Sequence, residues 1–262
     1  MNIPMWQVDS FTEKAFSGNP AGVCLLEGGW LEDRVLTSIA AENGASETAF
    51  LLRSAEGFDL RWFSPTTEVE LCGHGTLAAA KVLFDLRGWE GAEIRFQTRK
   101  RGGLAVVKKG AWFEMDFPAL PARPVATPAG LAEALGAEPL QVLESVEDWL
   151  AVLDDEAAVR ELTPDFGALR KHGCRCLVPT ARGAGVDFVS RAFAPRLGID
   201  EDPVTGSAHC VLAPYWTGVL GKDELRAHQV SARGGEVRCR VEGERVKLAG
   251  QAVVVLEGTL CV

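Results

Sequence analysis

The sequence predicts a mixed α/β (α+β) protein that consists of two similar domains. Short strand-like runs of apolar residues occur along the whole chain, and each half also contains one helix of small residues after a glycine-bearing turn. Prolines at positions 118, 121 and 124 mark a linker, residues 117–124, that we expect to form neither helix nor strand. A chain of 262 residues with 47% hydrophobic content has enough apolar material for two cores.

Helices are expected at two places in the first half. Residues 31–43 carry apolar side chains at helical spacing, and the Gly44 that follows them is typical of a helix end. Residues 76–84 are rich in alanine, so this helix can be buried on all sides. The other apolar runs are strand-like and lie at residues 3–11, 21–26, 47–52, 58–63, 92–97, 104–108 and 112–117.

The second half repeats this plan. Helices are expected near residues 129–135 and 156–162 and at residues 208–216, with strands near residues 140–153 and 186–193 and from residue 229 to 256. The turn at residues 72–79 aligns with the turn at residues 205–213, which suggests a pseudo-twofold relation between the halves. Two helix N-termini would then face one cleft.

The composition argues against several kinds of partner. The net charge of −9, from 27 basic and 36 acidic residues, gives an acidic surface that repels nucleic acid and anionic membranes. We find no signal-peptide pattern and no run of about 18 apolar residues, so we expect a soluble, cytoplasmic protein. The seven cysteines are scattered along the chain, and we expect them to be reduced thiols.

The two glycine turns are candidate anion-binding sites. A helix that begins at residues 73–75 or 206–208 exposes free backbone N–H groups, and glycine lets a carboxylate approach them closely. Neither turn is a P-loop or a dinucleotide-binding fingerprint. The alternative is that these glycines only form tight turns.

Three polar side chains near these turns are candidates for chemistry. Glu47 is a lone carboxylate among small and apolar residues, where partial burial would raise its pKa; the alternative is an exposed glutamate at a strand edge. His74 lies inside a glycine turn, which favours a role as a donor or orienting group. Asp202 either caps its own turn or helix, or pairs with His74 across a cleft.

The cysteines and histidines near the turns do not predict a metal site. Cys72, His74, His209 and Cys210 offer thiols and imidazoles, but the spacing lacks a Cys-x-x-Cys pair. Cys72 could instead be a thiolate base at a helix N-terminus, or a small buried apolar residue. Because no serine lies in a Gly-x-Ser-x-Gly motif, a hydrolase is not supported.

Several ordered sequence blocks resemble the PhzF (phenazine biosynthesis-like) family. The most specific blocks lie at residues 8–11 with 16–21, 46–50, 63–65 with 70–76, and 201–210. Residues 229–235 and 246–250 are also similar, so the resemblance covers nearly the whole chain. Several motifs in the same order are far more specific than any one of them.

The resemblance implies a diaminopimelate-epimerase-like fold. Each of its two pseudo-twofold-related domains wraps strands around a central helix; we expect them at residues 1–118 and 125–250, with residues 251–262 returning to the first domain. The resemblance further implies a cofactor-independent isomerase without a metal, acting on a small carboxylate substrate. We expect a homodimer with no nucleic-acid or membrane partner.

The resemblance also implies roles for individual residues. The family's glutamate, which shuttles a proton between carbons of a cyclic dihydroanthranilate-type substrate, corresponds to Glu47, and its histidine and aspartate correspond to His74 and Asp202. Backbone groups of the two glycine turns would bind the substrate carboxylate. The expected substrate-binding residues are Asn19, Cys72, Gly73, Gly206 and Ser207.

Two other functions remain open at this point. Related epimerases and racemases use one cysteine at each turn, whereas this chain has Cys72 at the first turn and Ser207 at the second. Cys210 lies three residues further into the helix and does not replace the missing thiol. The alternatives are therefore a racemase or epimerase that uses Cys72 as one base, and a small-carboxylate binding protein without turnover.

Overall fold

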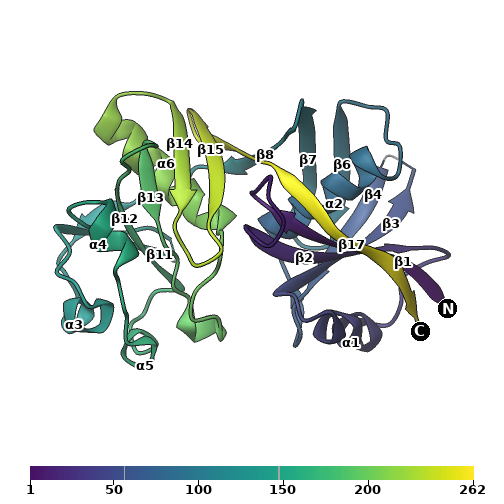
Figure 1. The fold of residues 1–262 in the computed structure, drawn as a ribbon, viewed down its shortest axis with the longest axis horizontal. Helices are drawn as coiled ribbons and strands as arrows, with labels where there is room; N and C mark the ends of the chain where they lie inside the picture. The colour runs from purple at the N-terminus through teal and green to yellow at the C-terminus, as the bar shows by residue number, and fades with distance from the viewer. Residues whose placement is uncertain (56, 147) are drawn as a thin grey trace. The chain divides into compact units, whose positions relative to one another are not determined.

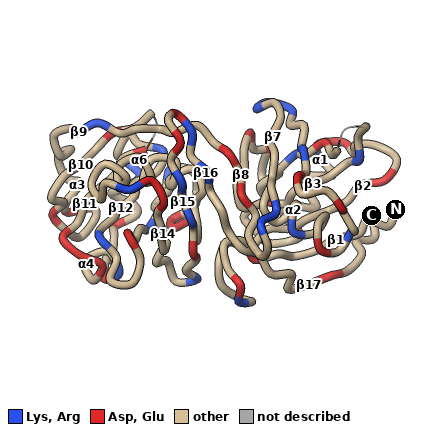
Figure 2. Tube along the Cα trace, turned by 90° about the horizontal axis from the view of Figure 1, so that it is seen from above, with Lys and Arg blue, Asp and Glu red and all other residues tan. Residues whose placement is uncertain are grey.

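The computed structural model describes residues 1–55, 57–146 and 148–262, which form two compact units. The first unit comprises Met1–Asp116 together with Ala249–Val262, and the second comprises Phe117–Leu248 (Figure 1). The C-terminal segment belongs to the first unit because β17 (Ala252–Cys261) pairs antiparallel with β1 (Asn2–Ser10). Acidic and basic residues are interspersed in both units (Figure 2).

The strands of the first unit form a mixed sheet. β1 pairs antiparallel with β17 and β2, β2 pairs parallel with β3, and β4 pairs antiparallel with β3 and parallel with β6. β7 continues the sheet antiparallel to β6 and β8. The remaining strands of this unit are β2 (Asn19–Leu26), β3 (Glu47–Ser54), β4 (Gly57–Phe63), β5 (Glu68–Val69), β6 (Glu93–Thr98), β7 (Gly102–Lys109) and β8 (Trp112–Pro118).

Helix α2 (Gly73–Asp85) is the buried centre of the first unit (Figure 1). It contacts β1, β2, β3, β7 and β17, and its residues 74–80 are all buried. The alanines predicted to permit burial on all sides let these strands approach the helix closely. Gly250 shows how close this approach is, because a Cβ there would lie 2.4 Å from the Phe11 ring and 2.9 Å from Leu77.

Helix α1 (Asp33–Asn43) packs on another part of the same unit. Leu36, Ile39 and Ala40 join a core cluster that includes strand residues from β1, β2, β3 and β4. The prediction that Gly44 ends this helix is confirmed: Gly44 has φ of 66° and its N–H donates to the carbonyl of Ala41.

The second unit repeats the plan of strands around one buried helix. Its strands pair in sequence order from β9 to β15, parallel in the pairs β11–β12 and β13–β14 and antiparallel in the others. The strands are β9 (Arg123–Val125), β10 (Gln141–Glu144), β11 (Asp148–Val152), β12 (Cys176–Arg182), β13 (Phe188–Ser190), β14 (Glu224–Gln229) and β15 (Gly235–Glu242). β16 (Arg245–Gly250) belongs to this unit up to Leu248, and its last two residues belong to the first unit.

Helix α6 (Gly206–Leu220) is the central helix of the second unit. Its residues 208–213 are all buried, and the helix contacts β11, β14 and β15. Trp216 stacks on Phe188 with ring centroids 5.7 Å apart, and its indole N–H donates to the Thr180 hydroxyl at 3.0 Å. The short helices are α3 (Leu131–Leu135), α4 (Glu156–Arg160), α5 (Phe166–Leu169) and the 3₁₀ turn η1 (Pro195–Leu197).

Some expected elements differ from the structure. The expectation of neither helix nor strand at residues 117–124 is wrong at both ends, because β8 reaches Pro118 and β9 begins at Arg123. Pro124 is tolerated in β9, a strand of three residues that pairs with β10, since proline fits a strand wherever the neighbouring strand does not need its missing N–H. The run at residues 140–153 forms two strands, β10 and β11, and residue 147 of that run lies outside the described part.

Candidate active site

Three side chains meet at the N-terminus of α2. Glu47 is the first residue of β3, Cys72 is the N-cap of α2, and His74 lies in the first turn. The sulfur of Cys72 accepts a hydrogen bond from the Gly75 N–H at 3.3 Å, so a thiol occupies the place that a serine or aspartate oxygen usually takes. The hydroxyl of Ser10 on β1 donates to the backbone carbonyl of His74 at 2.8 Å and fixes the turn.

The imidazole of His74 is the centre of this group. Its Nε2 lies 3.2 Å from Glu47 Oε2 and 3.3 Å from Ser46 Oγ. The Cys72 sulfur is 3.6 Å from Nδ1 and 3.7 Å from Nε2. His74 and Cys72 are 8% and 6% exposed, and the side chain of Glu47 is 14% exposed, so the group is dry except on the Glu47 side.

The pKa of Glu47 differs from the sequence expectation. Burial raises the pKa of this carboxyl, as expected, but the hydrogen bond and positive charge of His74 outweigh burial and bring the pKa below its ordinary value. The expectation of a raised pKa is therefore wrong, because it considered burial without the histidine. Glu47 is a carboxylate at neutral pH and can accept a proton.

The pKa values of the other two groups, His74 and Cys72, are both raised. Burial lowers the pKa of His74, but Cys72 and Glu47 outweigh burial, and the pKa of His74 lies well above its ordinary value. Burial raises the pKa of Cys72 more than the neighbouring His74 lowers it, so Cys72 is a thiol at neutral pH. Of the two neighbours that raise the pKa of His74, Cys72 contributes more and Glu47 adds to it.

A second polar group lies at the N-terminus of α6, in the second unit. The Thr205 hydroxyl donates to Asp202 Oδ2 at 2.6 Å, and the Thr205 N–H donates to Gln229 Oε1 at 2.8 Å. The Gln229 amide in turn donates to the backbone carbonyl of Asp202 at 2.7 Å. Of the two alternatives stated for Asp202, the turn-capping contact is the one observed within this unit.

Ser207, in the first turn of α6, is held by Arg175, which Asp148 holds in turn, and sequence reasoning missed both residues. Arg175 Nη2 donates to Ser207 Oγ at 3.1 Å and to Asp148 Oδ2 at 2.5 Å. Asp148 is buried at the start of β11, and Arg175 directly precedes β12. Neither residue lies in a recognisable motif, and only the parallel pairing of β11 with β12 brings them together.

The structure distributes the predicted site residues over both units. Asn19, Gly73 and the Glu47 group belong to the first unit, whereas Asp202, Gly206 and Ser207 belong to the second. Asn19 begins β2 opposite Ser10, and its side chain is fully buried.

The set of possible metal ligands also differs from the sequence inventory. Glu47, Cys72 and His74 each offer a donor atom, and these atoms all lie within 4.8 Å of one another. His209 and Cys210, which complete the inventory of thiols and imidazoles, lie on α6 in the second unit. Glu47 lies on β3, whereas Cys72 and His74 lie at the start of α2. The spacing of residues around the cysteines therefore could not indicate that the Glu47 carboxylate joins them.

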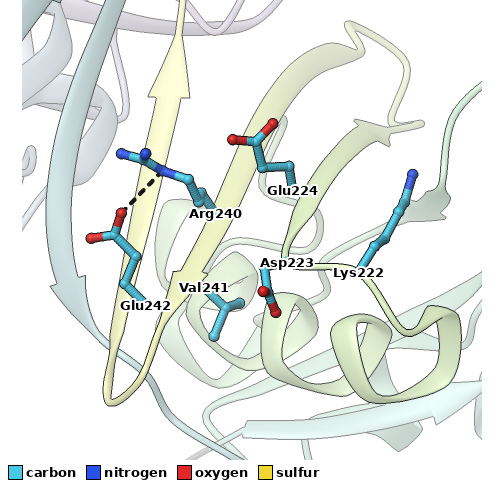
Figure 3. Close-up of a pocket in the computed structure, with 6 residues that line it drawn as sticks. All are labelled: Lys222, Asp223, Glu224, Arg240, Val241 and Glu242. Atoms are coloured by element: carbon cyan, nitrogen blue, oxygen red, sulfur yellow. Dashed lines mark ion pairs between the residues drawn. The ribbon is translucent and has the colours of Figure 1, made fainter.

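A shallow pocket of the second unit contains none of the predicted residues. Figure 3 shows its lining side chains, which come from the two residues before β14, the first residue of β14 and the end of β15. Arg240 and Glu242 form an ion pair at 3.3 Å across one side of it. The lining residues are Lys222, Asp223, Glu224, Arg240, Val241 and Glu242.

The fold and the polar helix N-termini define the class of protein. Two units, each with strands around one buried helix, make up the diaminopimelate-epimerase-like fold that the resemblance implies. No helix within the described residues has the length and apolar character needed to cross a membrane.

Comparison with known proteins identifies the family. The family model described as phenazine biosynthesis-like protein (PhzC-PhzF) matches residues 8–258, and the chain belongs to this family. An uncharacterized isomerase of Pseudomonas aeruginosa is 49% identical over 260 residues, which cover 99% of each chain. The crystal structure of a PhzF family phenazine biosynthesis protein from Enterococcus faecalis is 41% identical, covers 100% of both chains and has a TM-score of 0.97. The protein is therefore an isomerase of this family.

Proposed function

We propose that this isomerase moves a proton between carbons of a small cyclic carboxylate and that Glu47 is its acid/base. The observation that carries the proposal is the contact of 3.2 Å between Glu47 and His74 at the N-terminus of α2. A carboxylate that is largely buried, yet open to solvent on one side, can reach a substrate carbon. No metal, nicotinamide or flavin is required for this chemistry, since only a proton moves.

The lowered pKa of Glu47 determines what else the site must supply. A weak base removes a proton from carbon only where the resulting negative charge is stabilised. The protonated imidazole of His74 and the N-terminal end of α2 are the groups that can stabilise this charge. His74 would donate to the substrate while Glu47 holds the transferred proton.

The N-terminus of α6 is proposed to bind the substrate carboxylate. Backbone N–H groups of Gly206 and Ser207 are available at this helix start, with Gly73 and Asn19 contributing in the first unit. Because Arg175 donates to Ser207 Oγ, the proton of the serine hydroxyl can point elsewhere and donate to an anion. Asp202 would contribute through the turn that it caps, or by contact with a polar substrate group.

The alternative of a racemase with Cys72 as one base has less support. Burial raises the pKa of Cys72, and a thiol is a poor proton acceptor. We propose instead that Cys72 contacts the substrate and caps α2.

A homodimer is also proposed from the family resemblance. Light scattering measures the mass of the protein in solution and so tests this oligomeric state.

Proton transfer by one base can be tested by following the hydrogen that leaves the substrate carbon. A panel of small cyclic carboxylates is first screened by thermal shift, and those that bind are incubated with the enzyme in ²H₂O and followed by proton NMR. The proposal expects loss of one C–H signal with wild-type enzyme and none with Glu47→Gln, which still binds the compound.

The decisive comparison uses substrate deuterated at the labile carbon. Deuterium retained at the new carbon in a single turnover supports one base, since Glu47 holds the proton while the intermediate is bound. Inversion at a single carbon with solvent hydrogen incorporated would replace this proposal with a two-base epimerase.

A further inference from the structure

Ser46 is a second partner of the His74 imidazole, and the proposed mechanism does not use it. The hydroxyl oxygen of Ser46 lies 3.3 Å from His74 Nε2, and Glu47 Oε2 lies 3.2 Å from the same nitrogen. Two consecutive residues, one directly before β3 and one at its start, therefore meet a single ring nitrogen. A charged carboxylate and a neutral hydroxyl are acceptors of unequal strength, so the two contacts can serve different purposes.

The contact between Ser46 and His74 joins two fixed parts of the backbone. Ala45, on one side of Ser46, is buried, and Glu47, on the other side, pairs with β2. The turn that carries His74 is held at its backbone carbonyl by the Ser10 hydroxyl. The contact is therefore built into the first unit and does not depend on a long surface side chain.

The charges of the group determine where its hydrogen atoms lie. Burial lowers the pKa of His74, but Cys72 and Glu47 raise it well above its ordinary value, so both ring nitrogens carry hydrogen at neutral pH. The Nε2–H can then donate to Glu47 and to the Ser46 oxygen. Ser46 keeps its own hydroxyl proton to donate: burial raises the pKa of Glu47, whereas hydrogen bonds from His74 and Ser46 lower it.

Glu47 cannot keep the same contact with His74 throughout the proposed reaction. Its carboxyl must turn toward each of two substrate carbons, and once protonated it is a weaker acceptor for the Nε2–H. Because His74 is only 8% exposed, little water reaches it, and a buried donor without a partner is costly. Ser46 takes no part in the transfer, so its hydroxyl stays beside Nε2 when Glu47 turns away.

We propose that Ser46 is a positioning residue: its hydroxyl accepts the Nε2–H of His74 and holds the imidazolium in place while Glu47 carries the substrate proton. This inference rests on the proposed function of Glu47. Only hydrogen bonds change at Ser46 and His74, and the ring keeps both of its protons throughout the reaction. His74 thus remains a fixed positive charge beside the substrate while negative charge develops there.

The contact can be tested without a substrate. Glu47→Gln has a neutral side chain of nearly the same shape, so it represents the enzyme after Glu47 has taken a proton. With ¹⁵N-labelled histidine, NMR at about pH 5, where an imidazole is ordinarily charged, measures how fast the His74 ring protons exchange with water. Exchange of the Nε2–H should be slow in Glu47→Gln and at least about tenfold faster in Glu47→Gln/Ser46→Ala. The signals that disappear in His74→Gln are those of His74.

Matched variants separate the hydroxyl from the shape of the side chain. In the Glu47→Gln background, Ser46→Thr keeps a hydroxyl and should keep slow exchange, and Ser38→Ala, at an exposed serine of α1, should change nothing. Circular dichroism establishes that each variant is folded, and Ser46→Cys, a weaker acceptor of similar size, replaces Ser46→Ala if that variant is not. Exchange that is equally slow without the Ser46 hydroxyl, or already fast in Glu47→Gln, overturns the proposal.

Turnover gives an independent readout on the cyclic carboxylates that pass the screen described above. Ser46→Ala should lower kcat about tenfold and leave KM within about twofold, because Ser46 acts through His74 after the substrate has bound. Ser46→Thr should restore most of kcat, which a role in packing alone does not predict. Unchanged kcat in Ser46→Ala beside an inactive Glu47→Gln enzyme overturns this inference alone, whereas a fully active Glu47→Gln enzyme overturns the proposed function.

Discussion

His74 Nε2 lies 3.2 Å from Glu47 Oε2, and both side chains are largely buried at the start of α2. Each group stabilises the charged form of the other, so a carboxylate and an imidazolium coexist in a place where burial alone would neutralise both. This pair places a carboxylate and a positive charge 3.2 Å apart, with Glu47 the more exposed of the two side chains.

Glu47→Gln should remain folded and bind ligand but lose at least about 100-fold in turnover, the lower range for removal of a positioned acid/base. The amide has nearly the same shape, and it cannot accept the proton. Rate assays and circular dichroism measure the two effects, with the exposed Glu42→Gln on α1 as control. A folded, fully active Glu47→Gln enzyme would refute the assignment.

Cys72→Ala should keep most of the catalytic activity. Its thiol is protonated at neutral pH, so the substitution removes a helix cap and packing but no base. We expect a modest loss of stability, about 1 kcal/mol, in urea unfolding. A folded variant without any activity would instead favour the racemase.

Arg175→Met should raise KM about tenfold and change kcat less. Without the guanidinium, the Ser207 hydroxyl loses the donor that leaves its proton available to the substrate, and Asp148 loses a buried partner. Steady-state kinetics separate the two constants, and the exposed Arg182→Met is the control. An unchanged KM in a folded Arg175→Met enzyme would show that Ser207 does not depend on this contact.

Arg61→Met should destabilise the first unit by about 2 kcal/mol, because Glu68 loses its bidentate partner and keeps only the exposed Arg99, 3.2 Å away. Arg61 donates to both oxygens of Glu68 at 2.7 and 2.8 Å and to Asp33 at 2.7 Å. The control is Arg34→Met, whose ion pair with Glu32 is exposed and should contribute less than about 1 kcal/mol. Urea unfolding compares them, and equal effects would contradict the prediction.

His209 should make the second unit less stable in acid. Burial lowers the pKa of His209 from 6.5 to about 4, although its bond to the Thr205 carbonyl opposes this shift. Between these values the unfolded chain binds the proton and the folded chain does not, so stability is complete above pH 6.5 and falls as the pH drops toward 4. The loss should approach about 3 kcal/mol.

The measurement compares wild type with His209→Gln by urea unfolding at several pH values. Other titrating groups are common to both proteins, so the difference between them isolates His209. A difference that does not change from pH 6.5 to 4 would contradict the low pKa.

Local sequence patterns predicted the elements that hold the site. Helical spacing before Gly44 and the alanine run of α2 identified both helices of the first unit, because periodicity and end signals are properties of neighbouring residues. The glycine turns also directed attention to His74 and, through the ordered motifs, to Glu47. Short elements such as α5 and β5 were missed because an element of so few residues is too short to show a hydrophobic period.

The sequence by itself determined the two-domain α/β plan, the family and the residues at each helix start. Only the tertiary structure decided their chemistry. The pKa of Glu47 fell because a histidine 27 residues further along the chain reaches it. Arg175, which donates to Ser207, meets Asp148 because β11 and β12 pair in parallel. Charge interactions and hydrogen bonds act over a few ångströms in space, and spacing along the chain does not record which distant residues come within that range.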